Sequence, residues 1–137
     1  NRRKREKYME ELAKQDNPKA QKMYKEAKGM YFGICITDEE LTIEVLKSIK
    51  EFIAEGEVMH HCVNRCAYYS KDNSLILSAK VNGERMETIE IDLTDFRIVQ
   101  SRGKCNQNSP YHDRIVDLMN SNMGQIKAIK RKANKVA

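Results

Sequence analysis

Apolar and polar residues alternate with a period of two through the middle of the chain. Apolar side chains occupy every second position from residue 75 to 81 and again from 89 to 93, and a third short run covers 96–100. Such alternation is typical of strands that bury one face and leave the other polar. The pattern therefore predicts three antiparallel strands joined as a β-meander.

The Asn-Gly dipeptide between the first two runs favours a type I′ hairpin turn. A strict two-residue loop, however, would place Ile76 opposite Ile89 and turn the two apolar rows to opposite faces. A half-buried sheet cannot accept that register. We therefore predict a longer loop or a bulge across residues 82–86, which brings Leu77 opposite Ile89.

Helical patterns precede and follow the predicted strands in the sequence. Residues 2–14 have helical spacing, and the Asn-Pro dipeptide at 17–18 supplies the cap and first-turn proline of a second helix that ends near Gly33. A last helix begins at the Ser-Pro dipeptide at 109–110. Its buried stripe consists of Ile115, Leu118 and Met119. Gly124 interrupts the helix before a basic tail.

Another helix is predicted over residues 37–53. Thr37 and Glu40 have the spacing of a capping box, and the acidic residues of the first turn suit the helix dipole. With this helix, the expected fold class is α+β, with N-terminal helices, a three-stranded antiparallel β-meander and a C-terminal helix. The apolar stripe of the helix consists of Leu41, Val45, Leu46, Ile49, Phe52 and Ile53.

The chain of 137 residues is long enough for one domain with its own hydrophobic core. We expect a basic helical N-terminal segment at residues 1–36, a core domain at 37–123 and a basic C-terminal tail at 124–137. No apolar run approaches the roughly 18–20 residues that span a bilayer, so no membrane partner is expected. Four cysteines without other features of a secreted scaffold favour reduced thiols and a cytoplasmic location.

The net charge of +5 is distributed unevenly. Residues 1–28 carry ten Lys and Arg against five acidic residues, and residues 124–137 carry five with no acidic residue, whereas the middle holds ten basic and fifteen acidic residues. Basic ends can neutralise phosphates and predict contact with DNA or RNA, although solvated helix ends are the alternative. The expected arms comprise Arg2, Arg3, Lys4, Arg5, Lys130, Arg131 and Lys132.

The segment from Gly56 to Tyr69 has the highest density of reactive side chains in the chain. Each imidazole or thiol there can act as a metal ligand, a nucleophile or a proton carrier. Any chemistry that this protein performs is therefore expected to involve the segment. The reactive residues are His60, His61, Cys62 and Cys66.

Zinc is one interpretation of these residues. Structural zinc takes four nitrogen or sulfur ligands, usually delivered as pairs a few residues apart. Cys62 and Cys66 form one such pair and Cys105 with His112 a second, but neither has the tight spacing of a zinc knuckle. The alternative is that Cys66 and Cys105 are small buried side chains. We therefore favour no metal and no other cofactor, and keep zinc as the alternative.

Acid–base chemistry is the second interpretation. Cys62 is poorly placed to form a nucleophile–base pair with His61, because adjacent side chains diverge on a helix and alternate on a strand. His61 is better suited to act as a general acid or base that a residue from elsewhere completes. Glu90, on the polar face of its predicted strand, is the candidate for orienting it, although such a residue is usually a solvated carboxylate.

A third polar cluster follows the strands, over residues 98–108. Gln100, Arg102 and Asn106 there could bind a phosphate or the edge of a base through amide and guanidinium groups. The alternative is a polar loop whose side chains cap its own backbone.

The order of these motifs resembles the PcfJ-like family, which is named for a protein encoded on a conjugative plasmid. Members of that family have Gly, a short spacer and His-Cys-Val, then a Thr-Ile/Leu-Glu strand, then Gln-x-x-Gly-x-x-Asn. The resemblance covers residues 50–110, with Asn64 where the family tends to have Gly and Cys66 where it tends to have an aromatic residue. The matching positions are Gly56, His61, Cys62, Val63, Thr88, Ile89, Glu90, Gln100, Gly103 and Asn106.

The resemblance implies an accessory component of a mobile element, mostly bacterial, and carries no established biochemical activity. We expect the polar positions His61, Thr88, Glu90, Gln100 and Asn106 to converge in one pocket on the sheet. Two function classes follow. The favoured one is a module that binds nucleic acid or mobile-element proteins. The alternative is a small hydrolase or transferase that uses His61 as general acid/base, with Glu90 orienting it.

Overall fold

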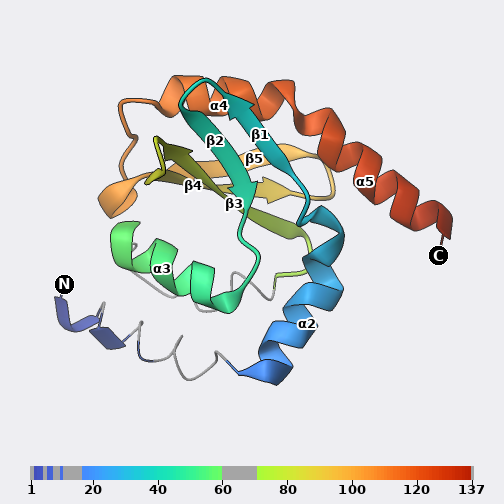
Figure 1. The fold of residues 1–137 in the computed structure, drawn as a ribbon, viewed down its shortest axis with the longest axis horizontal. Helices are drawn as coiled ribbons and strands as arrows, with labels where there is room; N and C mark the ends of the chain where they lie inside the picture. The colour runs from blue at the N-terminus through green and yellow to red at the C-terminus, as the bar shows by residue number, and fades with distance from the viewer. Residues whose placement is uncertain (1, 5, 8–9, 11–16, 60–70, 137) are drawn as a thin grey trace.

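The computed structural model describes residues 2–4, 6–7, 10, 17–59 and 71–136. Five strands form one antiparallel sheet in the order β1-β2-β3-β4-β5, so each strand pairs with its neighbours in sequence (Figure 1). The α+β class is confirmed. In chain order the elements are α2 (Pro18–Lys28), the 3₁₀ turn η1 (Gly29–Tyr31), β1 (Cys35–Asp38), β2 (Leu41–Val45), α3 (Ile49–Met59), β3 (Ser74–Val81), β4 (Glu84–Asp92), β5 (Arg97–Arg102), the 3₁₀ turn η3 (Lys104–Asn106), α4 (His112–Ser121) and α5 (Met123–Val136).

Helices cover both faces of the sheet, α4 and α5 on one side and α2 and α3 on the other (Figure 1). Under α4 and α5 lies the larger core, in which Leu77 and Ile89 of the sheet meet Met119 with no exposed surface. Alternate residues of a strand face opposite sides, so β3 presents its apolar row to this core and Ile76 to the other face. The smaller core, under α2 and α3, consists of Tyr24, Leu46, Phe52 and Ile76.

The predicted hairpin between β3 and β4 is confirmed together with its bulge. Both turn residues have positive φ, 51° at Asn82 and 82° at Gly83, as a type I′ turn requires. The register then shifts by one residue, which leaves Met86 without a partner. Leu77 consequently pairs with Ile89, and the two apolar rows share one face.

The helix predicted over residues 37–53 is wrong, and the sheet accordingly has five strands instead of three. This segment completes β1 and forms β2, and helix begins only at Ile49. Leu41, Ile43 and Val45 are all buried and alternate with less buried residues. Leu41 and Val45 are four residues apart, so they also fit a helical stripe. β-Branched side chains and pairing with β3 decide the strand.

Helix α2 follows the predicted cap at Asn17 but ends at Lys28, before the predicted end near Gly33. The Lys28 side chain is buried, and burial lowers the pKa of its ammonium group. The Lys28 ammonium attaches the end of α2 to the segment that leads into β3. The ammonium donates to the carbonyl oxygens of Lys71, Asp72 and Ser74 at 2.7, 3.1 and 2.6 Å.

The predicted last helix is two helices, α4 and α5, which meet at Asn122. The predicted basic tail, residues 124–137, therefore consists largely of α5, whose Ile126 is fully buried in the main core. The predicted boundary after residue 36 falls inside β1, where Ile36 also belongs to that core.

Candidate functional site

A buried carboxylate, Glu55, lies under α3 on one face of the sheet. It is one helical turn beyond Phe52 on the buried side of α3, and it is 2 % exposed. Burial raises the pKa of Glu55, whereas its hydrogen-bond donors and the charge of the nearby arginine lower it. The donors join α3 to β3 and β4, and they are Ser78 Oγ at 2.8 Å, Arg85 Nη1 at 2.8 Å and Thr88 Oγ1 at 2.5 Å.

A second carboxylate, Glu90, is 6 % exposed and lies two residues beyond Thr88 on the same face of β4. It accepts hydrogen bonds from Ser74 Oγ at 2.7 Å and Gln100 Nε2 at 3.2 Å, and Lys71 Nζ is 3.4 Å away. Two residues of a strand span about 6.6 Å, so Glu90 lies one step along the same face of β4 from Thr88, which donates to Glu55. We call this set the α3-face cluster: Glu55, Ser78, Arg85, Thr88, Glu90 and Gln100.

Three of the residues predicted to converge lie on this face. Glu90 pairs with Gln100 across β4 and β5, and Thr88 precedes Glu90 by two residues on β4. Asn106 instead lies exposed on η3, with a positive φ of 64° and no side-chain hydrogen bond to the described residues. His61 is outside the described residues, so its acid–base role stays a prediction.

Hydrogen bonds within the loop after β5 hold its own residues together, and the binding role of Gln100, Arg102 and Asn106 stays a prediction. Arg102 donates from Nη1 to Asn108 Oδ1 at 2.8 Å. The Gly103 amide donates to the Gln107 carbonyl at 2.6 Å. A Cβ on Gly103 would lie 2.8 Å from the Met86 carbonyl oxygen, so the close backbone approach requires glycine.

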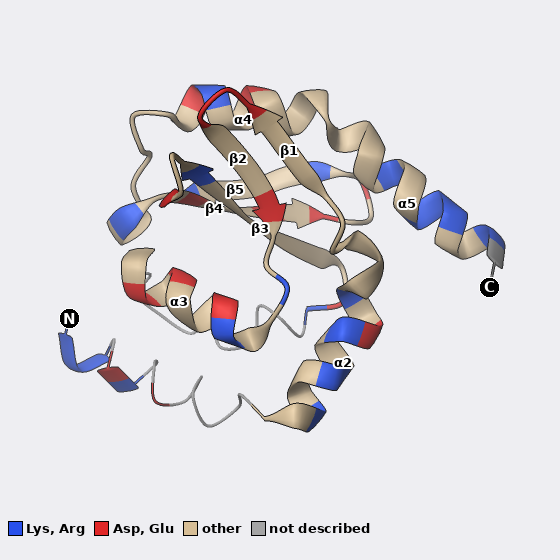
Figure 2. Ribbon diagram, viewed as in Figure 1, with Lys and Arg blue, Asp and Glu red and all other residues tan. Residues whose placement is uncertain are grey.

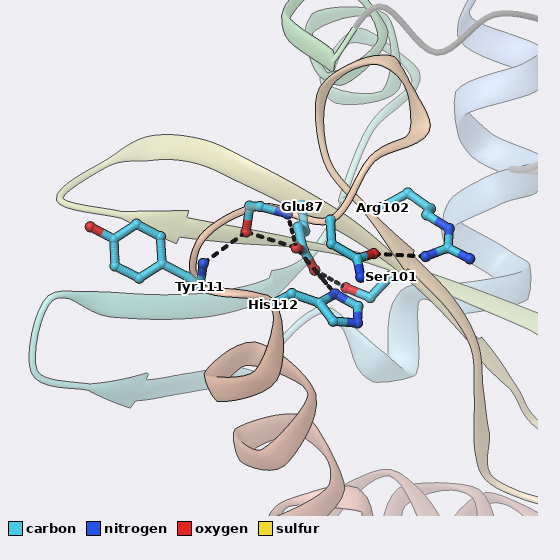
Figure 3. Close-up of polar contacts among 7 residues, drawn as sticks. Glu87, Ser101, Arg102, Tyr111 and His112 are labelled. Atoms are coloured by element: carbon cyan, nitrogen blue, oxygen red, sulfur yellow. Dashed lines mark hydrogen bonds and ion pairs between the residues drawn. The ribbon is translucent and has the colours of Figure 1, made fainter.

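A second buried polar cluster lies on the opposite face of the sheet, around Glu87 (Figure 3). Glu87 has no exposed surface and accepts hydrogen bonds from Ser101 Oγ at 2.6 Å and from both the amide and the hydroxyl of Ser109 at 2.7 Å. His112 Nδ1 is 3.0 Å from the same carboxylate. This Glu87 cluster joins β4 to β5, to the loop after it and to the start of α4.

Neither Glu55 nor Glu87 was predicted from the sequence, although each has a signal. Glu55 lies three residues after Phe52, on a stripe of otherwise apolar residues. Glu87 is in step with Ile89 and Ile91 on the apolar face of β4. An acidic residue at a core position needs buried donors, and this rule would have identified both residues.

Helix α5 is strongly basic (Figure 2), and most of its Lys and Arg residues are exposed. The helix carries five Lys and Arg residues and no acidic residue. Between α5 and the β4–β5 turn lies a groove of about 590 Å³. Lys127 and Lys130 place their ammonium groups 5.7 and 5.6 Å from the centre of the Phe96 ring. The groove is lined by Phe96, Lys127, Lys130, Arg131, Asn134 and Lys135.

Of the predicted C-terminal arm, Lys130 and Arg131 line this groove, whereas Lys132 is exposed on α5 but does not. Lys130 also donates to the Leu93 carbonyl at 2.5 Å, which fixes α5 to the turn. In the predicted N-terminal arm, Arg2, Arg3 and Lys4 are helical and exposed, and Arg5 lies outside the described residues. Each predicted arm is thus helical wherever the structure describes it.

A family model described as PcfJ-like protein matches residues 1–116. The chain belongs to the PcfJ-like protein family. No curated protein and no solved structure matches the chain.

The PcfJ-like match covers the sheet, α2, α3 and the start of α4, and therefore both buried clusters. The family positions Thr88, Glu90 and Gln100 meet in the α3-face cluster, and Gly103 provides the close approach after β5. Helix α5 and its basic groove lie beyond the matched residues.

The zinc candidates are divided between described and undescribed residues. Cys62 and Cys66 lie outside the described residues. Cys105 is exposed on η3, so the interpretation of Cys105 as a buried thiol is wrong, and His112 contacts Glu87. Among the described residues, no group of three His, Cys, Asp or Glu side chains could hold a metal ion. Within the same residues, no helix has the length and apolar character needed to cross a membrane.

Proposed function

We propose that this PcfJ-like protein is an accessory nucleic-acid-binding domain of a conjugative or other mobile-element system. The observation that carries the proposal is the basic side of α5. Lys127, Arg131 and Lys135 recur every four residues and line one groove, with a spacing of about 6 Å per step along the helix. A row of cations with this spacing can neutralise successive phosphates of one strand.

The charge distribution supports the same proposal. The described residues contain no ion pair to Lys127, Arg131, Lys132 or Lys135, so internal pairing does not neutralise the row. The body of the chain has an excess of acidic residues. Polyanions would be repelled there and directed to the basic helix.

The buried clusters, by contrast, already use their hydrogen-bonding capacity inside the fold. The Glu55 carboxylate has three donors and Glu87 has four contacts. No buried side-chain nitrogen or oxygen of the described residues lacks a partner. These groups therefore support a structural role, which leaves the exposed basic helix as the better binding surface.

Removing three charges from the groove tests the proposal. In the variant K127A/R131A/K135A, affinity for a fluorescein-labelled 20-nucleotide single strand should fall about 100-fold at 0.1 M salt, since each lost phosphate contact reduces the salt slope by about 0.7. Fluorescence anisotropy from about 0.05 to 0.3 M salt gives both values. Circular dichroism should confirm that the variant folds like the parent.

The matched control removes the same charge elsewhere. Lys19, Lys22 and Lys25 are exposed on α2, and K19A/K22A/K25A should weaken binding much less. An equal loss in the two triple variants would contradict a specific surface on α5. His61→Ala should leave affinity unchanged, because it removes no charge from the groove.

The alternative function is a small hydrolase or transferase with His61 as general acid/base and Glu90 orienting it. Its support is the presence of Glu90, Gln100 and Thr88 on one face, beside Lys71, the first described residue after the segment that contains His61. If the labelled strand is cut, and both H61A and E90Q abolish cutting without weakening binding, this alternative replaces the binding function.

A further inference from the structure

The basic groove of α5 contains one aromatic side chain, Phe96. We propose that this groove binds single-stranded nucleic acid, with the phosphates on the basic residues of α5 and one base stacked on the Phe96 ring. The inference rests on the proposed function and specifies its ligand. The shared chemistry is an unpaired polynucleotide, from either DNA or RNA.

Phe96 is held in place from two directions. Its backbone has a positive φ of 58°, and its amide donates to the Asp92 carbonyl at 2.8 Å, which closes the β4–β5 turn. The ring packs against the main core and remains partly exposed. Lys130 fastens α5 to the adjacent Leu93 carbonyl. The ring is therefore presented to the groove by a fixed turn, and little side-chain freedom is lost on binding.

An ammonium group beside the Phe96 ring can exchange its contact with the ring for a contact with a phosphate. The ammonium groups of Lys127 and Lys130 lie within cation–π distance of Phe96. A phosphate is a stronger partner for an ammonium group than an aromatic ring is. A strand that enters the groove would draw Lys127 to its phosphates and uncover part of the ring for a base, while Lys130 keeps its bond to the Leu93 carbonyl.

This geometry selects single strands over duplexes. In a duplex each base is already stacked on both faces, whereas an unpaired base can stack on an aromatic side chain. The basic row also occupies one side of one helix, so it can follow one phosphate backbone.

The test compares F96L with the parent protein on three probes of one sequence: single-stranded DNA, single-stranded RNA and the DNA duplex. Leucine keeps the apolar contact with the core but removes the aromatic face. The parent should bind the single strands at least tenfold more tightly than the duplex. F96L should weaken single-strand binding about tenfold and duplex binding less than twofold. Comparison of the DNA and RNA probes identifies which strand the groove prefers.

A control on the same helix separates the groove from the general charge of α5. Lys132 does not line the groove, so K132A should reduce single-strand affinity less than R131A does. The stacking site is overturned if F96L leaves single-strand binding unchanged, or if it weakens binding of the single strand and the duplex equally. The proposed function still stands in that case if K127A/R131A/K135A weakens binding. If the parent binds none of the three probes, both proposals fail.

Discussion

Replacing Glu87 by alanine is expected to lower the free energy of unfolding by about 3–5 kcal/mol, because several buried groups lose their acceptor together. The hydroxyls of Ser101 and Ser109, the Ser109 amide and His112 Nδ1 all contact this carboxylate. The deleted side chain also leaves a cavity at a fully buried position. Urea unfolding followed by circular dichroism at neutral pH measures the loss.

Two variants make the Glu87 result interpretable. Glu84 lies exposed on the same strand, so E84A should change the free energy of unfolding by no more than about 0.5 kcal/mol. E87Q retains one carbonyl acceptor and should cost about 1–3 kcal/mol, which keeps a measurable variant if E87A does not fold. Hydrogen exchange in E87Q should increase first in residues 103–109. A loss below about 1 kcal/mol in E87A would show that the cluster does not hold the loop and α4.

Replacing Glu55 by alanine is expected to lower the free energy of unfolding by a similar amount, about 3–5 kcal/mol, because it leaves the Arg85 guanidinium without its carboxylate. Arg85 is always charged, whereas Glu55 can take up a proton when its partner is removed. R85A should therefore cost less than E55A, and the difference should grow as the pH falls. Equal costs at all pH values would contradict a buried, coupled pair.

The pH dependence of Glu55 has a definite sign. Burial raises the folded-state pKa of Glu55 above the ordinary value of 4.5, so between these two values the folded protein binds more protons than the unfolded chain. The contribution of Glu55 to the free energy of unfolding therefore falls as pH rises through this interval. E55Q cannot titrate, so its stability relative to the parent should rise by up to about 1.4 kcal/mol per pH unit there and level off above it. A difference that is constant from pH 4.5 to 8 would contradict the raised pKa.

The β3–β4 hairpin shows that a local sequence pattern can predict how two strands pair. The apolar residues at every second position around Leu77 and Ile89, together with Asn-Gly between them, predicted this pairing through a longer loop or a bulge, because only one register buries both apolar rows. The same approach failed for residues 37–53. Leu41 and Val45 fit a helix and a strand equally well, and the hydrogen bonds to the neighbouring strands β1 and β3 decide between them.

The polar residues of the two buried clusters also divide into those that the sequence predicted and those that it did not. Thr88, Glu90 and Gln100 were expected to converge because the family resemblance singles them out and the period of two places Thr88 and Glu90 on the polar face, and the three residues do share a face. Glu55 and Glu87 were not predicted: each occupies an apolar position of its element, which is a signal of burial, but the donors that make this burial possible come from elements far apart in the chain. Burial of a carboxylate depends on those distant donors, which no local period reveals.

By itself the sequence determined the α+β class, the β3–β4–β5 meander with its bulge, the basic character of the chain ends and the family motifs. Period, turn chemistry and charge are local properties, so they can be recognised without the fold. Only the tertiary structure decided that β1 and β2 extend the sheet, that Glu55 and Glu87 are buried on opposite faces, and that Phe96 meets the basic side of α5 in one groove. Those features depend on contacts between residues distant in sequence, and the packing of helices on both faces of the sheet creates these contacts.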